Sequence, residues 1–392
     1  MRGHIRKRGS SWAVIVDLGQ DPDTGKRKQK WHSGFPTRKA AQEALVEILG
    51  RLKTGNYVTP KKLTFGEYLE SWLSGLKSQV RPSTWESYER NVRIHVKPRL
   101  GHIYVQQLTP TALTSCYAEL LDGGRREGRN VTEGRGEGLS PRTVHYIHTI
   151  IHRALRDAMN DGIVVQNVAD RARPPKQRAV KSNEMRTWAA SELRAFLEHV
   201  TEDRLYPVFM VAATTGMRRG EVLGLRWRDI DLDAARASIR QTIVCVRHEI
   251  CFSEPKTKKG KRSVPLAPET VAVLRAHRKR QAEERLAIGA AYEDRDLVFA
   301  GPNGSPLDPE SVSLVFDRRV ARSGLPRVRF HDLRHTFATL ALQASVHPKV
   351  VSEILGHSNI SITLDTYSHA IPAMQEAATT QVAQLVFGGA GA

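Results

Sequence analysis

The chain has 392 residues, a length that suits two to four domains, and a formal net charge of +19. About 40 % of the residues are hydrophobic and 26 % are charged, which is ordinary for a folded protein and excludes a disordered basic tail. No run of 18 apolar residues occurs, and the first eight residues, MRGHIRKR, lack an apolar stretch, so neither a spanning helix nor a secretory signal is predicted. Three cysteines are too few for a disulfide framework, and we expect a cytoplasmic protein.

The positive charge indicates a polyanionic partner, most simply nucleic acid, although basicity can also serve solubility alone. Residues 1–62 carry a net charge of +9, nearly half of the excess in less than a sixth of the length. Alternating apolar residues predict a strand over 12–18, a turn at 21–25 and a returning strand over 29–35. Thr37 is placed to cap a following helix. We expect a small sheet on one helix, with solvated basic strand positions that suit a DNA groove: Arg6, Arg8, Arg27 and Lys30.

The next part, residues 63–172, is predicted to be helical, with helices near 64–76, 83–95, 109–122 and 140–160. Each begins at an N-cap signal: Thr64, Ser83, Thr109 and Ser140. The glycine-rich stretch 123–138 between the last two helices is interpreted as a loop and not as a nucleotide site, because no strand precedes it. Residues 173–186 are predicted to be a basic linker that can follow a phosphate backbone.

The remainder, from about residue 187, is predicted to mix helices and strands. Ser191 is expected to cap a helix, and an apolar helix follows over 205–215. A strand over 237–252 is expected to pair with an antiparallel return over 261–266, with a polar tip at 254–260 between them. Further helices are predicted near 268–287, 308–323, 331–345, 348–355, 361–367 and 372–386.

Several familiar catalytic motifs are absent from the sequence. It contains no Gly-x-x-x-x-Gly-Lys-Ser/Thr phosphate loop, which disfavours ATP-driven work. It contains neither His-Glu-x-x-His nor Cys-x-x-Cys, so a zinc site is not expected either. We therefore expect neither a cofactor nor a metal.

Five short segments contain basic side chains or a tyrosine that could belong to a catalytic site, and each segment alone is weak evidence for one. A lone arginine after a glycine turn is usually a surface charge, and a lone tyrosine in an amphipathic helix usually packs in the core. The segments are Thr215–Glu221, Pro255–Lys258, His331–His335, Leu355–His357 and Thr366–His369.

Together these segments resemble the signature of the tyrosine recombinase (phage-type integrase) family, whose order is Arg, Lys, His-x-x-Arg, His or Trp, and Tyr. The matching residues are Arg218, Lys256, His331, Arg334, His357 and Tyr367. The resemblance covers about residues 187–370. It implies a multidomain, mainly α fold with small antiparallel β elements. The first implied part is an arm-type DNA-binding domain at 1–60, with a three-stranded sheet and a helix. A helical, SAM-like core-binding domain follows at 63–172. The linker at 173–186 then leads to a mixed α/β catalytic domain with a C-terminal tail at 187–392.

The resemblance also implies a role for each residue. Tyr367 attacks a DNA phosphodiester, which forms a 3′-phosphotyrosine and frees a 5′-hydroxyl. Arg218 and Arg334 suit the phosphoryl oxygens, because a guanidinium is permanently charged and binds two oxygens at once. His331 is implied as the general base that takes the tyrosine proton, and His357 as a hydrogen-bond donor to a non-bridging phosphate oxygen. Lys256, or alternatively Lys258, is implied as the general acid that protonates the leaving 5′-oxygen. Glu221 is implied as the partner that orients Arg218.

The function implied is the integration of a mobile element or phage genome into host DNA, without ATP or metal. Two alternatives stay open, a resolvase for plasmid or chromosome dimers and a DNA-binding architectural or regulatory protein with an inactive domain. The implied partners are double-stranded DNA at core and arm sites and further copies of the chain in a homotetramer on DNA. A host DNA-bending protein and an excision factor are the implied accessory partners, all in the bacterial nucleoid and away from membranes. The apolar C-terminal residues 382–387 either dock on a neighbouring protomer or pack on their own domain.

Overall fold

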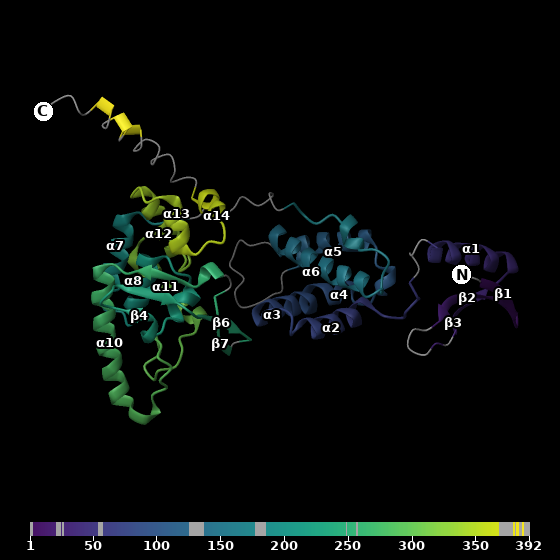
Figure 1. The fold of residues 1–392 in the computed structure, drawn as a ribbon, viewed down its shortest axis with the longest axis horizontal. Helices are drawn as coiled ribbons and strands as arrows, with labels where there is room; N and C mark the ends of the chain where they lie inside the picture. The colour runs from purple at the N-terminus through teal and green to yellow at the C-terminus, as the bar shows by residue number, and fades with distance from the viewer. Residues whose placement is uncertain are drawn as a thin grey trace. The chain divides into compact units, whose positions relative to one another are not determined.

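The computed structural model describes residues 3–20, 25, 27–53, 58–124, 137–176, 186–247, 249–255 and 258–367, and the pairs 379–380, 382–383 and 386–387. The fold is mostly helical with small antiparallel sheets, as predicted (Figure 1). The chain divides into two compact units, Met1–Lys181 and Ser182–Ala392. Within the described ranges, every helix is too short or too polar to cross a membrane.

The first unit begins with a three-stranded antiparallel sheet, in the order β1 (Gly3–Arg8), β2 (Ser11–Gln20) and β3 (Arg27–Phe35). The helix α1 (Arg38–Lys53) packs on one face, where Val14 and Val16 meet Ala41 and Leu45. Thr37 caps this helix, since its hydroxyl accepts a hydrogen bond from the N–H of Ala40 at 3.1 Å. The predicted sheet on one helix is confirmed.

The strand register separates the two faces of this sheet, because residues paired directly across strands share a face. Trp31 pairs with Ile15 on the face that α1 leaves uncovered, and it is 43 % exposed. Arg6 lies on this same face, opposite Ala13. Lys30 instead pairs with the buried Val16, so its side chain leaves β3 on the helix-covered face and does not join this basic surface.

The helical part of the first unit contains five α-helices in the described residues: α2 (Phe65–Leu76), α3 (Pro82–Asn91), α4 (Lys97–Leu100), α5 (Pro110–Gly123) and α6 (Pro141–Asn160). A single apolar cluster holds them together, with Phe65, Leu113 and Ile147 fully buried. A π-helical turn over Val92–Val96 continues α3 into α4. The four predicted helices are confirmed, whereas the extension through α4 was not expected.

Three of the predicted caps in this part are present. The side chains of Thr64, Thr109 and Ser140 each accept a hydrogen bond from a backbone N–H in the first turn of their helix. The predicted cap at Ser83 is wrong, because α3 already begins at Pro82. Proline fixes a helical φ and needs no N–H at the first position, so it starts the helix one residue before Ser83.

The second unit is built on a large apolar core that includes Trp188, Phe196, Phe209 and Phe316. Around it lie α7 (Ala190–His199), α8 (Tyr206–Thr215), α9 (Arg219–Leu223), α10 (Pro268–Ile288) and α11 (Pro309–Ser323). The predicted cap at Ser191 is wrong, because α7 already includes it. The side chain of Glu192 instead accepts from the N–H of Ala189, 2.7 Å away, and this contact satisfies the start of the helix.

The predicted long strand over 237–252 is also wrong. It is divided into β5 (Arg236–Ile239), β6 (Thr242–Val246) and β7 (Glu249–Ser253). The return strand β8 (Arg262–Pro265) pairs with β5, and β5 also pairs with the short β4 (Ile230–Asp231), whereas β6 and β7 form a separate hairpin. Arg247 at its turn has a φ of +51°, which reverses the chain after β6.

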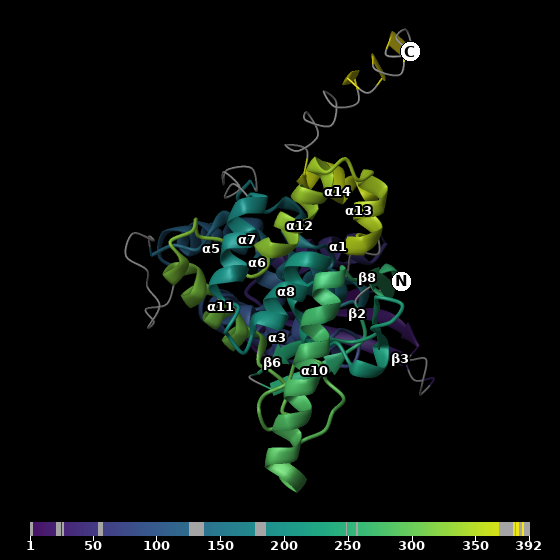
Figure 2. The same ribbon diagram turned by 90° about the vertical axis from the view of Figure 1, so that its left-hand side faces the viewer.

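Three helices complete the described part of this unit: α12 (Asp332–Gln343), α13 (Pro348–Leu355) and α14 (Ile360–Thr366). They agree with the predicted helices and lie together at one end of the unit in both views (Figures 1 and 2). Most of the predicted helix over 372–386 falls outside the described residues, as do most of the loop 123–138 and of the linker 173–186.

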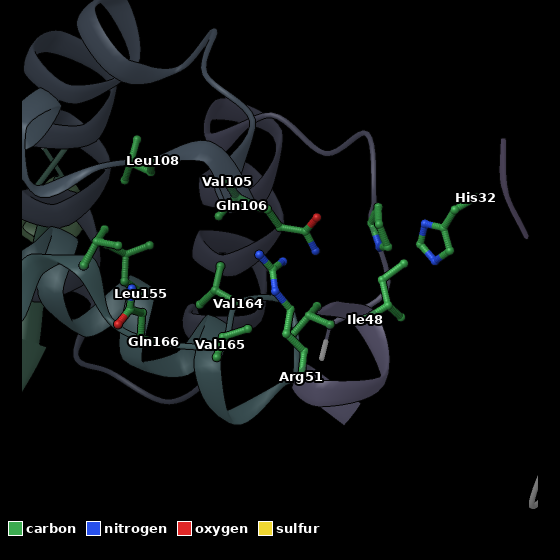
Figure 3. Close-up of a pocket in the computed structure, with 13 residues that line it drawn as sticks. His32, Ile48, Arg51, Val105, Gln106, Leu108, Leu155, Val164, Val165 and Gln166 are labelled. Atoms are coloured by element: carbon green, nitrogen blue, oxygen red, sulfur yellow. The ribbon is translucent and has the colours of Figure 1, made fainter. Parts of the chain in front are cut away.

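Figure 3 shows a pocket of the first unit that is lined by residues such as Ile48, Gln106 and Val164. Its lining contains none of the six residues predicted to be catalytic. Five of the six predicted catalytic residues are described, and all five lie in the second unit.

Candidate active site

A glycine turn after α8 delivers the first candidate residue. Gly216 ends the helix with a φ of +62°, and a Cβ at this position would lie 2.6 Å from the ring of Phe337 and 2.8 Å from Leu355. Glycine is therefore required by both the backbone and the packing. The turn places Arg218 immediately before α9.

Arg218 is oriented by Glu221, as predicted. Its backbone N–H donates to Oε2 of Glu221 at 2.9 Å, and its Nη1 donates to Oε1 at 2.8 Å. The side chain of Arg218 is 42 % exposed, whereas that of Glu221 is only 4 % exposed. Burial alone raises the pKa of Glu221, but hydrogen bonds and charges from Arg262 and Arg218 outweigh it and hold the pKa below its usual value. A buried carboxylate thus fixes a guanidinium that remains accessible.

Arg334 is buried on α12 and binds two backbone carbonyls. Its Nη1 donates to the oxygen of Gly216 and its Nη2 to the oxygen of Leu355, both at 2.8 Å. Burial and then the charge of Arg218 lower its pKa to about 9, so Arg334 is still mostly charged at neutral pH.

The C-terminal end of α13 brings three arginines together, because its last carbonyls lack partners within the helix. Arg262 Nε donates to the oxygen of Ile354 at 2.5 Å, and Arg334 donates to that of Leu355. The Nη2 of Arg218 lies 3.4 Å from the oxygen of Gly356. Three consecutive carbonyls therefore each bind a different guanidinium. With Glu221 as the acid between two of them, these side chains carry a net charge of +2.

His357 follows directly on this end of α13. Its Nδ1 lies 2.8 Å from the hydroxyl of Thr363, which fixes the ring. Burial and then the charges of Arg334 and Arg218 lower its pKa to about 4, so the ring is neutral at pH 7. Lys259 of the β7–β8 connection donates to the oxygen of Ser358 at 2.9 Å, and both line a cleft beside His357. Lys256 lies outside the described residues, and so does the side chain of Lys258.

His331 precedes α12 and is an exposed residue. Burial by the surrounding protein, followed by the charges of His335 and Arg334, nevertheless lowers its pKa to about 4. A neutral imidazole of this kind can accept a proton. Its ring lies 5.2 Å from that of His335, one helical turn further on.

Tyr367 directly follows α14, and its side chain is fully buried among apolar residues of α12 and α13, including Ala338, Leu342 and Val351. Its hydroxyl lies 2.8 Å from Nδ1 of His335. Burial raises the pKa of Tyr367 to about 12, although the charge of Arg334 opposes the shift.

Two ionisable side chains that contact Tyr367 or Glu221 were not assigned a role from the sequence. His335 lies four positions after His331, a spacing that puts both on one helix face and could have indicated it. Arg262 was assigned only to a strand, and no local pattern indicates that it reaches Glu221, 41 positions away. Among the described residues, no group of three or more metal-ligating side chains is arranged to hold an ion.

Family models match the chain in three consecutive stretches. The model of the phage integrase family covers residues 143–374, which is more than half of the chain. The chain belongs to the phage integrase family. An arm DNA-binding domain matches at residues 4–52, and a SAM-like N-terminal domain of phage integrases matches at 64–121. Members of this family, the tyrosine recombinases, are enzymes that cut and rejoin DNA.

One curated relative is the tyrosine recombinase XerC-like protein of Caldanaerobacter subterraneus subsp. tengcongensis, which is 28 % identical over 94 % of this chain and 95 % of its own length. Two solved structures share the fold. The Tn1549 transposon integrase in complex with a circular intermediate DNA matches with a TM-score of 0.64 at 20 % identity, over 80 % of this chain and 99 % of that one. A lambda integrase tetramer bound to a Holliday junction matches with a TM-score of 0.55 at 18 % identity, over 91 % and 95 %.

Proposed function

We propose that this protein is a site-specific integrase that cuts and rejoins DNA through a phosphotyrosine at Tyr367. The observation that carries the proposal is the convergence of Arg218, Arg334 and His357 at the C-terminal end of α13. Their surplus of positive charge matches a phosphodiester, whose transition state for attack carries additional negative charge on its oxygens. The six catalytic residues are proposed to be Arg218, Lys256, His331, Arg334, His357 and Tyr367.

In the proposed cleavage step, the Tyr367 oxygen forms a bond to phosphorus while the bond from phosphorus to the 5′-oxygen breaks. The tyrosine proton goes to His331, and Lys256 or Lys258 supplies a proton to the leaving 5′-oxygen. The negative charge of the bound phosphate favours protonated histidine, which raises the low pKa of His331 toward its usual range. A 5′-hydroxyl from a second duplex then attacks the phosphotyrosine and restores a phosphodiester, so the bond energy is conserved and neither ATP nor a metal ion is required.

This reaction requires Tyr367 to leave its buried position, since a fully covered hydroxyl cannot reach a phosphate. His335 holds the hydroxyl until then, through the 2.8 Å hydrogen bond. Release breaks one hydrogen bond and exposes the ring, and the arriving phosphodiester, bound to Arg218 and Arg334, offers the compensating interaction.

Integration is proposed over dimer resolution because of the arm domain. The uncovered face of its sheet presents Arg6 and Trp31, a basic and aromatic surface that suits a DNA groove. We further propose that the protein works as a tetramer on core and arm sites in the bacterial nucleoid, aided by a DNA-bending host protein and an excision factor.

The test is a suicide duplex that carries the attachment site of the protein's own element, with a nick that lets the 5′-hydroxyl fragment diffuse away. The Tyr367→Phe variant is expected to form no covalent adduct while its affinity for the duplex stays within about twofold. Tyr292→Phe, a change in a tyrosine outside the site, serves as the matched control and should form adducts as the unmodified protein does. Adducts that persist in Tyr367→Phe would reject this tyrosine as the nucleophile.

A further inference from the structure

Glu221 is shared by two arginines that differ in their access to solvent. Its Oε1 accepts from Arg218, and its Oε2 accepts from Nη2 of Arg262 at 2.9 Å. The side chain of Arg218 is 42 % exposed and that of Arg262 is 8 % exposed. Arg218 is therefore accessible to a ligand, whereas the guanidinium of Arg262 makes its hydrogen bonds within the protein.

Arg262 also packs directly on the turn that carries His357. Its Nε donates to the oxygen of Ile354, in the last turn of α13. At Gly356, where φ is +68°, a Cβ would lie 2.8 Å from Nη1 of Arg262. The guanidinium thus fills the space that a side chain at position 356 would need, and it connects β8 to both α9 and the end of α13.

We propose that Arg262 is a positioning residue for DNA cleavage, which holds Glu221 and the Gly356 turn so that Arg218 and His357 meet the scissile phosphate in a fixed geometry. The proposal rests on the function proposed above. It adds a second positioning residue beside Glu221, one that acts through Arg218 and His357 and does not touch DNA.

Charge explains why two arginines share one carboxylate. Paired with Arg218 alone, Glu221 would cancel the positive charge that the phosphate requires. With Arg262 as a second partner, the group formed by these three residues keeps a net charge of +1, and Arg334 adds another. Loss of Arg262 would therefore weaken the electrostatic stabilisation of the transition state and also loosen the geometry of Arg218.

Shape explains why lysine cannot replace this arginine. One planar guanidinium reaches both oxygens of Glu221 and the oxygen of Ile354, with distances of 2.5 to 3.3 Å. An ammonium keeps the charge but cannot direct donors along these fixed directions. Arg262→Lys should thus recover only part of the function that Arg262→Met loses.

The first experiment measures single-turnover cleavage of the suicide duplex at saturating DNA. Residues that hold the ligands of a catalytic metal in place typically contribute about 10- to 100-fold to activity, and we expect a loss of similar size in the cleavage rate of Arg262→Met. Arg204→Met is the matched control, because Arg204 also bridges a carboxylate, Glu284, and a backbone carbonyl, that of Ala300. This variant should cleave within about threefold of the unmodified protein. Equal slowing in both variants would reduce Arg262 to a structural role and overturn the proposal.

A double variant tests whether Arg262 acts through Arg218. In an Arg218→Ala background, Arg262→Met should cost less than it costs alone, because only its action through the Gly356 turn and His357 remains. The same full factor in both backgrounds would contradict the proposal.

A binding measurement separates this proposal from the proposed function, since it needs no cleavage. In Tyr367→Phe protein, we compare affinity for duplexes with a normal scissile phosphate and with a neutral methylphosphonate. Preference for the charged phosphate should fall at least about threefold in both Arg218→Ala and Arg262→Met, and remain in Arg204→Met. Retained preference in Arg262→Met overturns the positioning role. The preference for the charged phosphate can fall as expected even if the unmodified protein forms no covalent adduct. That combination would support the positioning role of Arg262 and contradict the proposed cleavage reaction.

Discussion

The group α2–α6 and the group α12–α14 are both helical, but they bury different kinds of side chain. In the first, the apolar cluster is accompanied by two buried polar residues, Asn91 and Asn167, and no charged residue is buried among its described residues. In the second, the apolar cluster around Tyr367 adjoins Arg334, a guanidinium that is 4 % exposed. Burial of a charge is unfavourable unless it is paired and hydrogen-bonded, so a charged residue is kept in such a place at a cost in stability. This difference is the one expected if the second region carries the proposed chemistry and the first serves stability alone.

The largest expected effect comes from the buried charge in the second region. Arg334→Met should slow cleavage at least about 100-fold, because a proposed donor to the phosphate is lost. It should also lower the free energy of unfolding by about 1–3 kcal/mol, since the carbonyls of Gly216 and Leu355 lose their partner. Single-turnover cleavage and urea denaturation measure the two effects. Arg334→Lys should restore the charge but little of the rate, and full activity in this variant would contradict the two-carbonyl geometry.

The counterpart in the first region should change stability alone. Ile147→Ala removes a fully buried side chain from α6 and should lower the free energy of unfolding by about 2–5 kcal/mol. Met159→Ala, on the same helix but 40 % exposed, should change it by less than about 1 kcal/mol. Both variants should cleave at the normal rate once folded and bound to DNA. A specific loss of cleavage chemistry in Ile147→Ala would remove the distinction between the two regions.

A smaller effect is expected at the hydrogen bond that holds Tyr367. His335→Phe keeps a ring at this position but leaves the tyrosine hydroxyl without this partner, which should cost about 1 kcal/mol of stability. Its cleavage rate should change by less than about tenfold, whereas His331→Phe should lose about 100-fold or more as the proposed base. The opposite order of the two rates would identify His335 as the group that takes the proton.

The last comparison concerns pH, and it distinguishes histidines of the two regions. Burial, followed by the charges of His152 and His145, lowers the pKa of His148 on α6 to about 4, the same value as for His357. Between about pH 6.5 and 4, the unfolded chain binds protons at these positions and the folded chain does not, so stability falls as pH falls.

DNA should remove this pH dependence in one region only. The phosphate raises the pKa of His357 but does not approach His148 in the proposed complex. His148→Phe should therefore reduce the difference in the free energy of unfolding between pH 7 and pH 5, both with and without DNA. His357→Phe should reduce this difference mainly in the absence of DNA. Denaturation at pH 5 and pH 7 measures this, and equal behaviour of the two variants in DNA would contradict the placement of His357 at the phosphate.

Sequence patterns predicted most of the helices because their information is local. The caps at Thr64, Thr109 and Ser140 and the apolar period of α6 need no distant partner. The errors have local causes as well, since a proline began α3 before Ser83 and a turn at Arg247 interrupted the predicted strand.

The side-chain network of the site could be predicted only in part. The pairing of Glu221 with Arg218 follows from their spacing on one helix face, and it is confirmed. The contacts of Arg262 with Glu221 and of His335 with Tyr367 join residues 41 and 32 positions apart. The periodicity of apolar residues along the sequence does not predict such contacts, because they form only when separate elements pack together.

The most direct test of the central claim is to trap the covalent complex on the suicide duplex, digest it with protease and identify the peptide that carries the nucleotide. The account predicts one modified residue, Tyr367, joined to the 3′-phosphate of the cleaved strand, with a free 5′-hydroxyl on the other side. A nucleotide attached to a different residue, or cleavage that leaves a 3′-phosphate without any attached peptide, would contradict it.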